Sequence, residues 1–166
     1  MGRTGHIADI RAHIGTRLLL MPAVAAAVFD DAGRLLLLHH LHDDSWGLPG
    51  GAMEPDETPA TAAARELREE TGLELEPTAL VGVCGGPDHV ITYPNGDRTA
   101  YVTSLFAFDA DGAEVVPDGS EVDAARWCRP DDVADLALDS STVELLATIR
   151  AWLSAPPTAR AARFRR

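Results

Sequence analysis

The hydrophobic positions of the chain fall first into short runs of strand length. Two such runs, 18–20 and 23–29, are separated by Met21 and Pro22, and we expect the proline to interrupt the strand. The segment 30–33 has turn composition, so a strand at 34–41 would complete a hairpin. Further strands are predicted at 80–83, 89–93, 99–108 and 122–128, with a hairpin turn at 93–97.

Helical spacing appears in four other places. Isoleucines at 7, 10 and 14 predict a short amphipathic helix that ends at Gly15 and lies against the main body. Thr58 and Pro59 form a cap and first turn, and Gly72 ends the predicted helix 59–71. A short helix should begin at Pro130, and a longer one, capped by Asp139 or Ser140, should run to about residue 153. The segment 43–51, with three glycines and a proline, is predicted to be an irregular loop.

The composition describes one folded domain. The chain has 166 residues, of which 46% are hydrophobic and 24% charged, close to the averages of globular proteins. Its net charge of −12 argues against a nucleic acid polymer as partner. We divide the chain into an N-terminal helical extension (1–17), a main domain (18–155) and a basic, flexible tail (156–166) with four arginines.

The cysteines and the N-terminus favour a cytoplasmic protein. Cys84 and Cys128 lack the spacing of a metal site or a disulfide framework, which fits a reducing compartment. No signal peptide is evident, because charged residues and His13 interrupt the N-terminal apolar stretch. The longest apolar run, 18–29, is too short to span a bilayer, so we expect no membrane association.

The chemistry is concentrated in the acidic helix 59–71. Glu66, Glu69 and Glu70 are three and four residues apart, and they are therefore predicted to share one face of it. Three carboxylates on one face repel one another unless a cation lies between them. Oxygen ligands suit hard cations such as Mg²⁺, which commonly binds substrate phosphates as well. The alternative is a solvated acidic face whose partners are Arg65 and Arg68.

The segment 51–73 resembles the signature of the Nudix hydrolase family, Gx5Ex7REUxEExGU, where U is aliphatic. The matching residues are Gly51, Glu57, Arg65, Glu66, Leu67, Glu69, Glu70, Gly72 and Leu73. The resemblance extends over about residues 18–153 and implies an α/β fold, an α/β/α sandwich around a mixed β-sheet. It also implies metal-dependent hydrolysis of a nucleoside diphosphate linked to another group, X.

The resemblance assigns roles position by position. Glu66, Glu69, Glu70 and the carbonyl oxygen of Gly50 would bind Mg²⁺ or Mn²⁺. Arg65 would orient the glutamates, and Glu57 would support the loop or bind a bridging water. The general base would be Glu69, which we favour, or Glu121 before the last strand.

The identity of X stays open. Pro87 lies near the position of a proline associated with ADP-ribose hydrolysis in the family, which favours ADP-ribose or a similar small-molecule nucleotide. The alternatives are a pyrophosphohydrolase of ordinary or 8-oxo-nucleoside triphosphates and a non-catalytic nucleotide-binding module. The apolar N-terminal segments could form a homodimer interface. Side chains that could reach the substrate are His39, His40, His42, Trp46, His89, Tyr93 and Asp97, although a packing role is the default for the last four.

Overall fold

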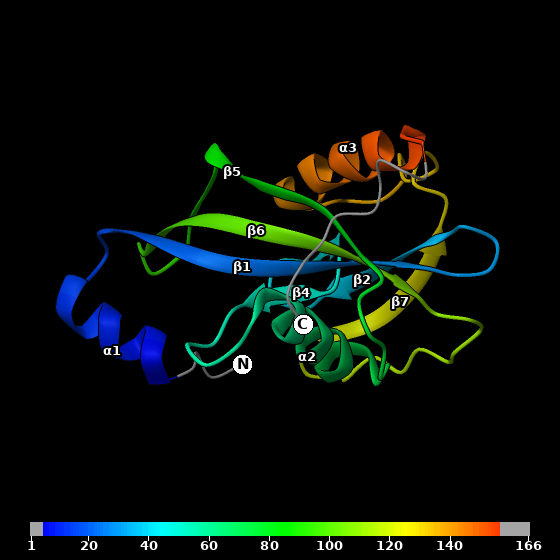
Figure 1. Ribbon diagram of the computed structural model, residues 1–166. Coiled ribbons are helices and arrows are strands. Elements are labelled where there is room, and N and C mark those ends of the chain that lie inside the picture. The colour runs from blue at the N-terminus through cyan, green and yellow to red at the C-terminus, as the bar shows by residue number, and fades with distance from the viewer. Residues whose placement is uncertain (1–4, 157–166) are drawn as a thin grey trace.

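The computed structural model describes residues 5–156 and contains a mixed β-sheet between two helices, with a third helix at the N-terminus (Figure 1). Its elements are, in order, α1 (Gly5–Ile14), β1 (Leu18–Phe29), β2 (Leu35–His40), β3 (Ser45–Gly47), β4 (Gly50–Ala52), α2 (Pro59–Thr71), β5 (Ala79–Thr92), β6 (Arg98–Asp109), β7 (Val122–Cys128) and α3 (Ser140–Ser154). The basic tail predicted at 156–166 lies outside the described residues except for Pro156.

The sheet is organised around β1. This strand pairs in parallel with β6 along its whole length, from Leu18 opposite Arg98 to Phe29 opposite Asp109. The other pairings are antiparallel: β6 with β5, β2 with β3 and β7, and β1 with β2 and β4. The predicted hairpin of β1 and β2 is confirmed, although the two strands pair only where Phe29 faces Leu35.

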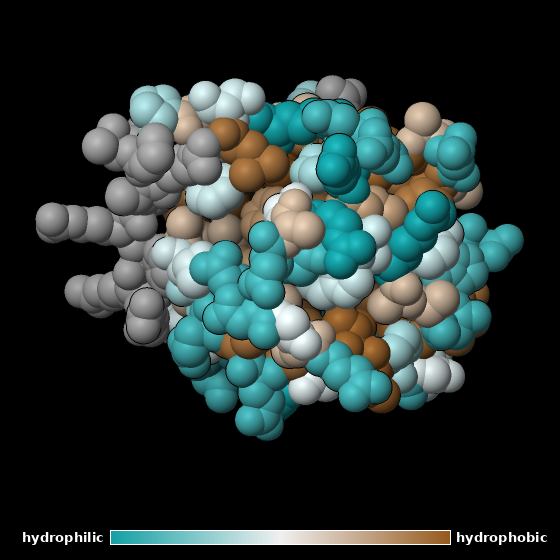
Figure 2. All heavy atoms as spheres, turned by 90° about the vertical axis from the view of Figure 1, so that its right-hand side faces the viewer, coloured by the Kyte–Doolittle hydropathy of each residue, from teal (hydrophilic) through white to brown (hydrophobic). Residues whose placement is uncertain are grey.

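Alternate residues of β1 enter two separate cores, one on each face of the sheet. Val24, Ala26 and Val28 pack on the side of α2, whereas Ala25 and Ala27 pack on the side of α3. Figure 1 shows these two helices on opposite sides of the sheet. The expected α/β/α sandwich is therefore confirmed. One end of the molecule, seen in Figure 2, is covered mainly by hydrophilic side chains, with hydrophobic ones in small areas between them.

Two predicted interruptions of strands are wrong. Pro22 does not divide β1, because β1 pairs with β6 from Leu18 to Phe29 without a break, and the Pro22 carbonyl accepts a hydrogen bond from the Met53 amide just after β4 (3.3 Å). The predicted strands 80–83 and 89–93 belong to one strand, β5. A bulge accommodates the residues between them, since Gly85 faces Val102 while Val90 already faces Ala100.

Two further expectations are corrected. The loop at 43–51 contains the short strands β3 and β4, which form because β2 and β1 offer them backbone partners. The short helix predicted at Pro130 is absent from the described chain, where turns connect β7 to α3. By contrast, α2 has the predicted bounds, and the hairpin turn at 93–97 is closed by backbone hydrogen bonds between Tyr93 and Asp97 and between Gly96 and Tyr93.

The N-terminal helix is held by a buried arginine rather than by its isoleucines alone. Arg11 donates hydrogen bonds to the carbonyl oxygens of Arg17 (2.7 Å) and Arg98 (2.8 Å) and to the hydroxyl of Thr99 (2.8 Å). Its Nε lies 3.7 Å from a carboxylate oxygen of Asp97 in the hairpin turn. Arg11 therefore fixes α1 to the turn between β5 and β6.

Candidate active site

Local sequence determines where α2 begins and ends, and thereby which side chains it presents. The hydroxyl of Thr58 accepts a hydrogen bond from the Thr61 amide (3.2 Å), and the Thr61 hydroxyl accepts one from the Thr58 amide (3.0 Å). Gly72 ends the helix in the left-handed conformation, with φ of 71°. Buried alanines and Leu67 pack this helix on the sheet. Glu66 and Glu70 belong to the same buried face of the helix, and their carboxylates lie next to β4.

Two of the three glutamates are buried against β4. Glu66 and Glu70 are each only 5% exposed. The Gly50 amide donates a hydrogen bond to Oε2 of Glu70 (3.1 Å), and a Cβ on Gly51 would collide with the Glu66 carboxylate. A Cβ on Gly50 would instead collide with the backbone of β1, at the Val24 carbonyl oxygen, so the two glycines allow close approaches on different sides. The solvated-face alternative is excluded for Glu66 and Glu70.

The burial of Glu66 and Glu70 strongly disfavours their charged forms. Desolvation, together with the charge of Glu66, raises the pKa of Glu70 to about 9, although the Gly50 amide opposes this shift. Desolvation likewise raises the pKa of Glu66, which the adjacent Arg65 only partly offsets. Glu121 adds to the repulsion at both groups. A cation bound between these carboxylates would therefore stabilise their charged forms.

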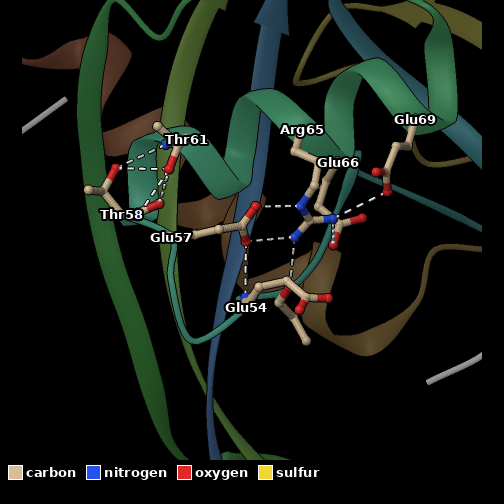
Figure 3. Close-up of polar contacts among 8 residues, drawn as sticks. Glu54, Glu57, Thr58, Thr61, Arg65, Glu66 and Glu69 are labelled. Atoms are coloured by element: carbon tan, nitrogen blue, oxygen red, sulfur yellow. Dashed lines mark hydrogen bonds and ion pairs between the residues drawn. The ribbon is translucent and has the colours of Figure 1, made fainter. Parts of the chain in front are cut away.

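Arg65 connects the acidic residues to one another (Figure 3). Its Nε and Nη2 donate to the two carboxylate oxygens of Glu57 (2.6 and 2.9 Å), an arrangement that lowers the pKa of Glu57. Nη1 lies 2.9 Å from Glu66 and 3.2 Å from Glu69, and Nη2 also donates to the Ala52 carbonyl. Arg65 thus joins the loop before α2, the helix and β4.

Glu69 and Glu121 occupy different surroundings. The side chain of Glu69 is 43% exposed, with Arg65 as its ion-pair partner. Glu121 lies on the loop before β7, where its amide bonds to the Asp118 carboxylate and its carbonyl accepts from the Leu41 amide. The structure therefore brings both predicted candidates for the general base to the region of Glu66 and Glu70.

The carboxylate oxygens of this site are ligands of the kind that a hard divalent cation prefers. Among residues 5–156, no three His, Cys, Asp or Glu side chains stand ready as a preformed metal cluster. Glu66 and Glu70 are nevertheless buried carboxylates that repel each other, and within residues 5–156 Arg65 contacts Glu66 but not Glu70. Such a pair suits an ion that needs few protein carboxylates and takes its other oxygens from water and phosphate.

A cavity of about 380 Å³ lies beside Gly50 and Gly51. Its walls come from β1, the ends of β5 and β6, the segment after β2 and the first turn of α3. Among the histidines predicted as candidates, His40, His42 and His89 line it. The two glycines next to the buried glutamates therefore also line the cavity, whereas Glu66, Glu69 and Glu70 do not.

The other candidate residues serve the fold. His39 points away from the cavity and contacts Asp123 (2.7 Å) and Asp44 (3.1 Å), so it shares no site with His40, as their alternation along a strand predicts. Trp46 packs in the core on the side of α3. Asp97 binds Arg11. Pro87 is exposed in the bulge of β5 and does not line the cavity.

Comparison with known proteins identifies this arrangement. A family model described as the NUDIX domain matches residues 19–149, most of the chain. The chain belongs to the Nudix family. A "MutT-like protein" of Streptomyces ambofaciens is 36% identical over 124 residues, which cover 75% of this chain and 73% of that protein. The predicted class, a Nudix pyrophosphohydrolase, is therefore confirmed.

Solved Nudix structures show the same fold. A MutT NUDIX hydrolase from Burkholderia pseudomallei is 28% identical, with a TM-score of 0.65 over 78% of this chain and 98% of that one. An ADP-ribose pyrophosphatase from Streptococcus suis is 27% identical, with a TM-score of 0.59 over 81% and 92% of the two chains. None of the helices within residues 5–156 has the length and apolar character needed to cross a bilayer.

Proposed function

We propose that this Nudix hydrolase uses Mg²⁺ or Mn²⁺ to cleave the diphosphate bond of a nucleoside diphosphate linked to X, with ADP-ribose or a similar nucleotide derivative as substrate. The observation that carries the proposal is that Glu66 and Glu70 are buried side by side against Gly50 and Gly51 of β4. Burying two carboxylates side by side is unfavourable unless a cation binds them. The cavity that Gly50 and Gly51 also line can hold the rest of a nucleotide.

In this proposal each residue of the site has a separate task. Glu66, Glu69, Glu70 and the Gly50 carbonyl hold the metal, which when bound supplies positive charge to the diphosphate and acidifies water. Arg65 holds Glu66 and Glu69 in place through Nη1, since Glu57 fixes the edge of its guanidinium group formed by Nε and Nη2. A water attacks phosphorus, its proton passes to the carboxylate of Glu69, and the bond from that phosphorus to the bridging oxygen breaks.

Two considerations support ADP-ribose as the first substrate to test. The similar structure from Streptococcus suis is described as an ADP-ribose pyrophosphatase. Pro87 stands near the position associated with that activity in the family. The similarity to a MutT-like protein favours a second candidate function, the hydrolysis of ordinary or 8-oxo-nucleoside triphosphates. The complete signature argues against a non-catalytic binding module.

We also propose a cytoplasmic homodimer. Leu18 and Leu20, in the segment predicted to form its interface, are 50% and 69% exposed, so apolar surface is available there. Size-exclusion chromatography with light scattering tests the dimer, and Leu20→Glu should convert it to a monomer. A wild-type monomer would refute it.

The function is tested by incubating the protein with ADP-ribose, NADH, diadenosine polyphosphates, nucleotide sugars and nucleoside triphosphates. Each reaction contains Mg²⁺ or Mn²⁺, or EDTA as control, and products are identified by mass. AMP and ribose 5-phosphate from ADP-ribose, formed only with metal, would support the proposal. Pyrophosphate from triphosphates would favour the second candidate, and absence of turnover throughout would favour a binding module.

A further inference from the structure

Apolar and aromatic side chains form a large part of the lining of the cavity beside Gly50 and Gly51. Its floor is apolar, formed by residues of β1 with Leu48, Ile91 and Leu145. Two aromatic rings, Tyr93 and Tyr101, add to the wall, and their hydroxyls lie 2.5 Å apart. A flat aromatic group could pack on such a surface. The volume of about 380 Å³ is near the lower end of the range found for small-molecule sites.

The charges around the cavity exclude a phosphate chain as its occupant. No arginine is among the described residues that line it, and the sequence contains no lysine. Two lining side chains, Asp43 and Asp139, are acidic. Burial lowers the pKa of His40 on the same wall, which favours its neutral form. An uncharged group with hydrogen-bonding edges is therefore the suitable ligand.

His89 is the polar group best placed to recognise such a ligand. The bulge in β5 carries it out of the regular pairing with β6, and its side chain is 8% exposed while lining the cavity. Its Nε2 contacts the Glu144 carboxylate on α3, an ion pair when His89 is protonated. Within residues 5–156, no hydrogen bond is recorded for its Nδ1. Glu144 thus fixes the ring and leaves Nδ1 available to a ligand.

The proposed function places the nucleoside of the substrate in this cavity, and we propose that within it His89, positioned by Glu144, determines which nucleobase is accepted. This inference rests on the proposed function, because the nucleotide's phosphates must lie over Gly50 and Gly51, next to Glu66 and Glu70, while its base and ribose enter the cavity. His89 contacts the base edge through Nδ1, and Tyr93 and Tyr101 pack on the ring. Glu144 acts as a positioning residue.

Calorimetric titration of the full-length protein tests this assignment. The probes are AMP, GMP, CMP and UMP, with ribose 5-phosphate and pyrophosphate as partial ligands. We expect one nucleotide to bind at least about tenfold more tightly than ribose 5-phosphate. His89→Leu should weaken that nucleotide about tenfold and leave pyrophosphate unchanged. If circular dichroism shows that the leucine variant is unfolded, His89→Gln replaces it in the same titrations, with the same expected result.

Arg150 provides the matched control for the positioning role. It also forms an ion pair from α3, with Asp131, but this pair does not border the cavity. Glu144→Gln should weaken the preferred nucleotide and alter its selectivity over the other three, whereas Arg150→Gln should not. Equal effects of the two variants would reduce Glu144 to a structural role and overturn this part of the proposal.

The outcomes separate this inference from the proposed function. If no mononucleotide binds more tightly than ribose 5-phosphate, or if His89→Leu weakens pyrophosphate equally, the nucleoside assignment is overturned even when the enzyme is active. If the predicted binding pattern appears but the wild type hydrolyses none of the substrates, the nucleoside assignment holds and the proposed hydrolysis fails.

Discussion

The carboxylate of Glu66 lies against the backbone of Gly51, leaving no space between them for a methyl group. The helix that supplies the glutamate and the strand that faces the cavity are thereby in direct contact. Any side chain at residue 51 must displace the carboxylate, since the end of a glutamate moves more readily than the strand.

The first prediction concerns this contact. Gly51→Ala should leave the fold intact and lower kcat by about 10- to 100-fold, because displacing a catalytic group by about 1 Å costs on that order. Thermal unfolding and steady-state kinetics measure the two effects. Gly5→Ala is the control, since a Cβ at Gly5 meets nothing within 4 Å. An alanine variant with wild-type kcat would show that Glu66 need not occupy its observed position.

The second prediction concerns pH and the metal. The folded-state pKa of Glu70 is raised to about 9, so the unfolded chain releases this proton first as pH rises. The metal-free protein should therefore lose stability between about pH 4.5 and 9, by more than about 1 kcal/mol. Added Mg²⁺ should restore the stability that is lost over this pH range. Thermal melts in EDTA and in Mg²⁺ across this range measure the effect.

The same reasoning makes Glu70→Gln informative. Without the charge, the metal-free variant should be more stable than the wild type at pH 8, yet its turnover should fall about 100-fold or more. Glu74→Gln is the control, because this residue follows α2 and is exposed. A variant that retains full turnover, or a wild type whose melting temperature does not respond to Mg²⁺, would contradict the metal assignment.

The third prediction separates the candidates for the general base. Glu69→Gln should lower kcat by a factor of about 10² to 10⁴ and remove the acidic limb of the pH–rate profile. Glu121→Gln should have a smaller effect and keep that limb. Parallel pH profiles of kcat for the two variants decide the matter. A larger loss of kcat in Glu121→Gln than in Glu69→Gln would identify Glu121 as the general base.

The fourth prediction concerns Arg11. Arg11→Met removes the ion pair with Asp97 and the hydrogen bonds to the carbonyl groups of Arg17 and Arg98, so it should lower the free energy of unfolding by about 3 kcal/mol. KM should also rise, because Tyr93, at the base of the same turn, lines the cavity. Denaturant titration and kinetics test this, with exposed Arg17→Met as control. Unchanged stability would mean that α1 is held by other contacts.

The sequence predicts best those features that local interactions determine. Helix α2 has its predicted bounds because Thr58 and Gly72 cap it without help from the rest of the chain. The signature residues are identified by their resemblance to a family pattern, which is itself a local feature of residues 51–73. The turn at 93–97 follows from its own asparagine and glycine.

Features that depend on distant partners could not be predicted. Strands β3 and β4 exist because β2 and β1 pair with them, and three residues carry too little pattern to reveal this. The burial of Glu66 and Glu70 depends on how closely β4 approaches α2, which spacing along a helix does not indicate. The role of His89 depends on a bulge, for which Gly85 and Gly86 were the only local sign.

The parallel pairing of β1 with β6 affects the order in which parts of the chain can fold during synthesis. These partners lie about 80 residues apart in sequence, and β1 cannot complete this pairing until residue 109 has left the ribosome. The signature helix is synthesised well before that point and can form its local caps early. The nascent chain therefore contains its acidic cluster, with β4 beside it, before the pairing of β1 with β6 can complete the sheet.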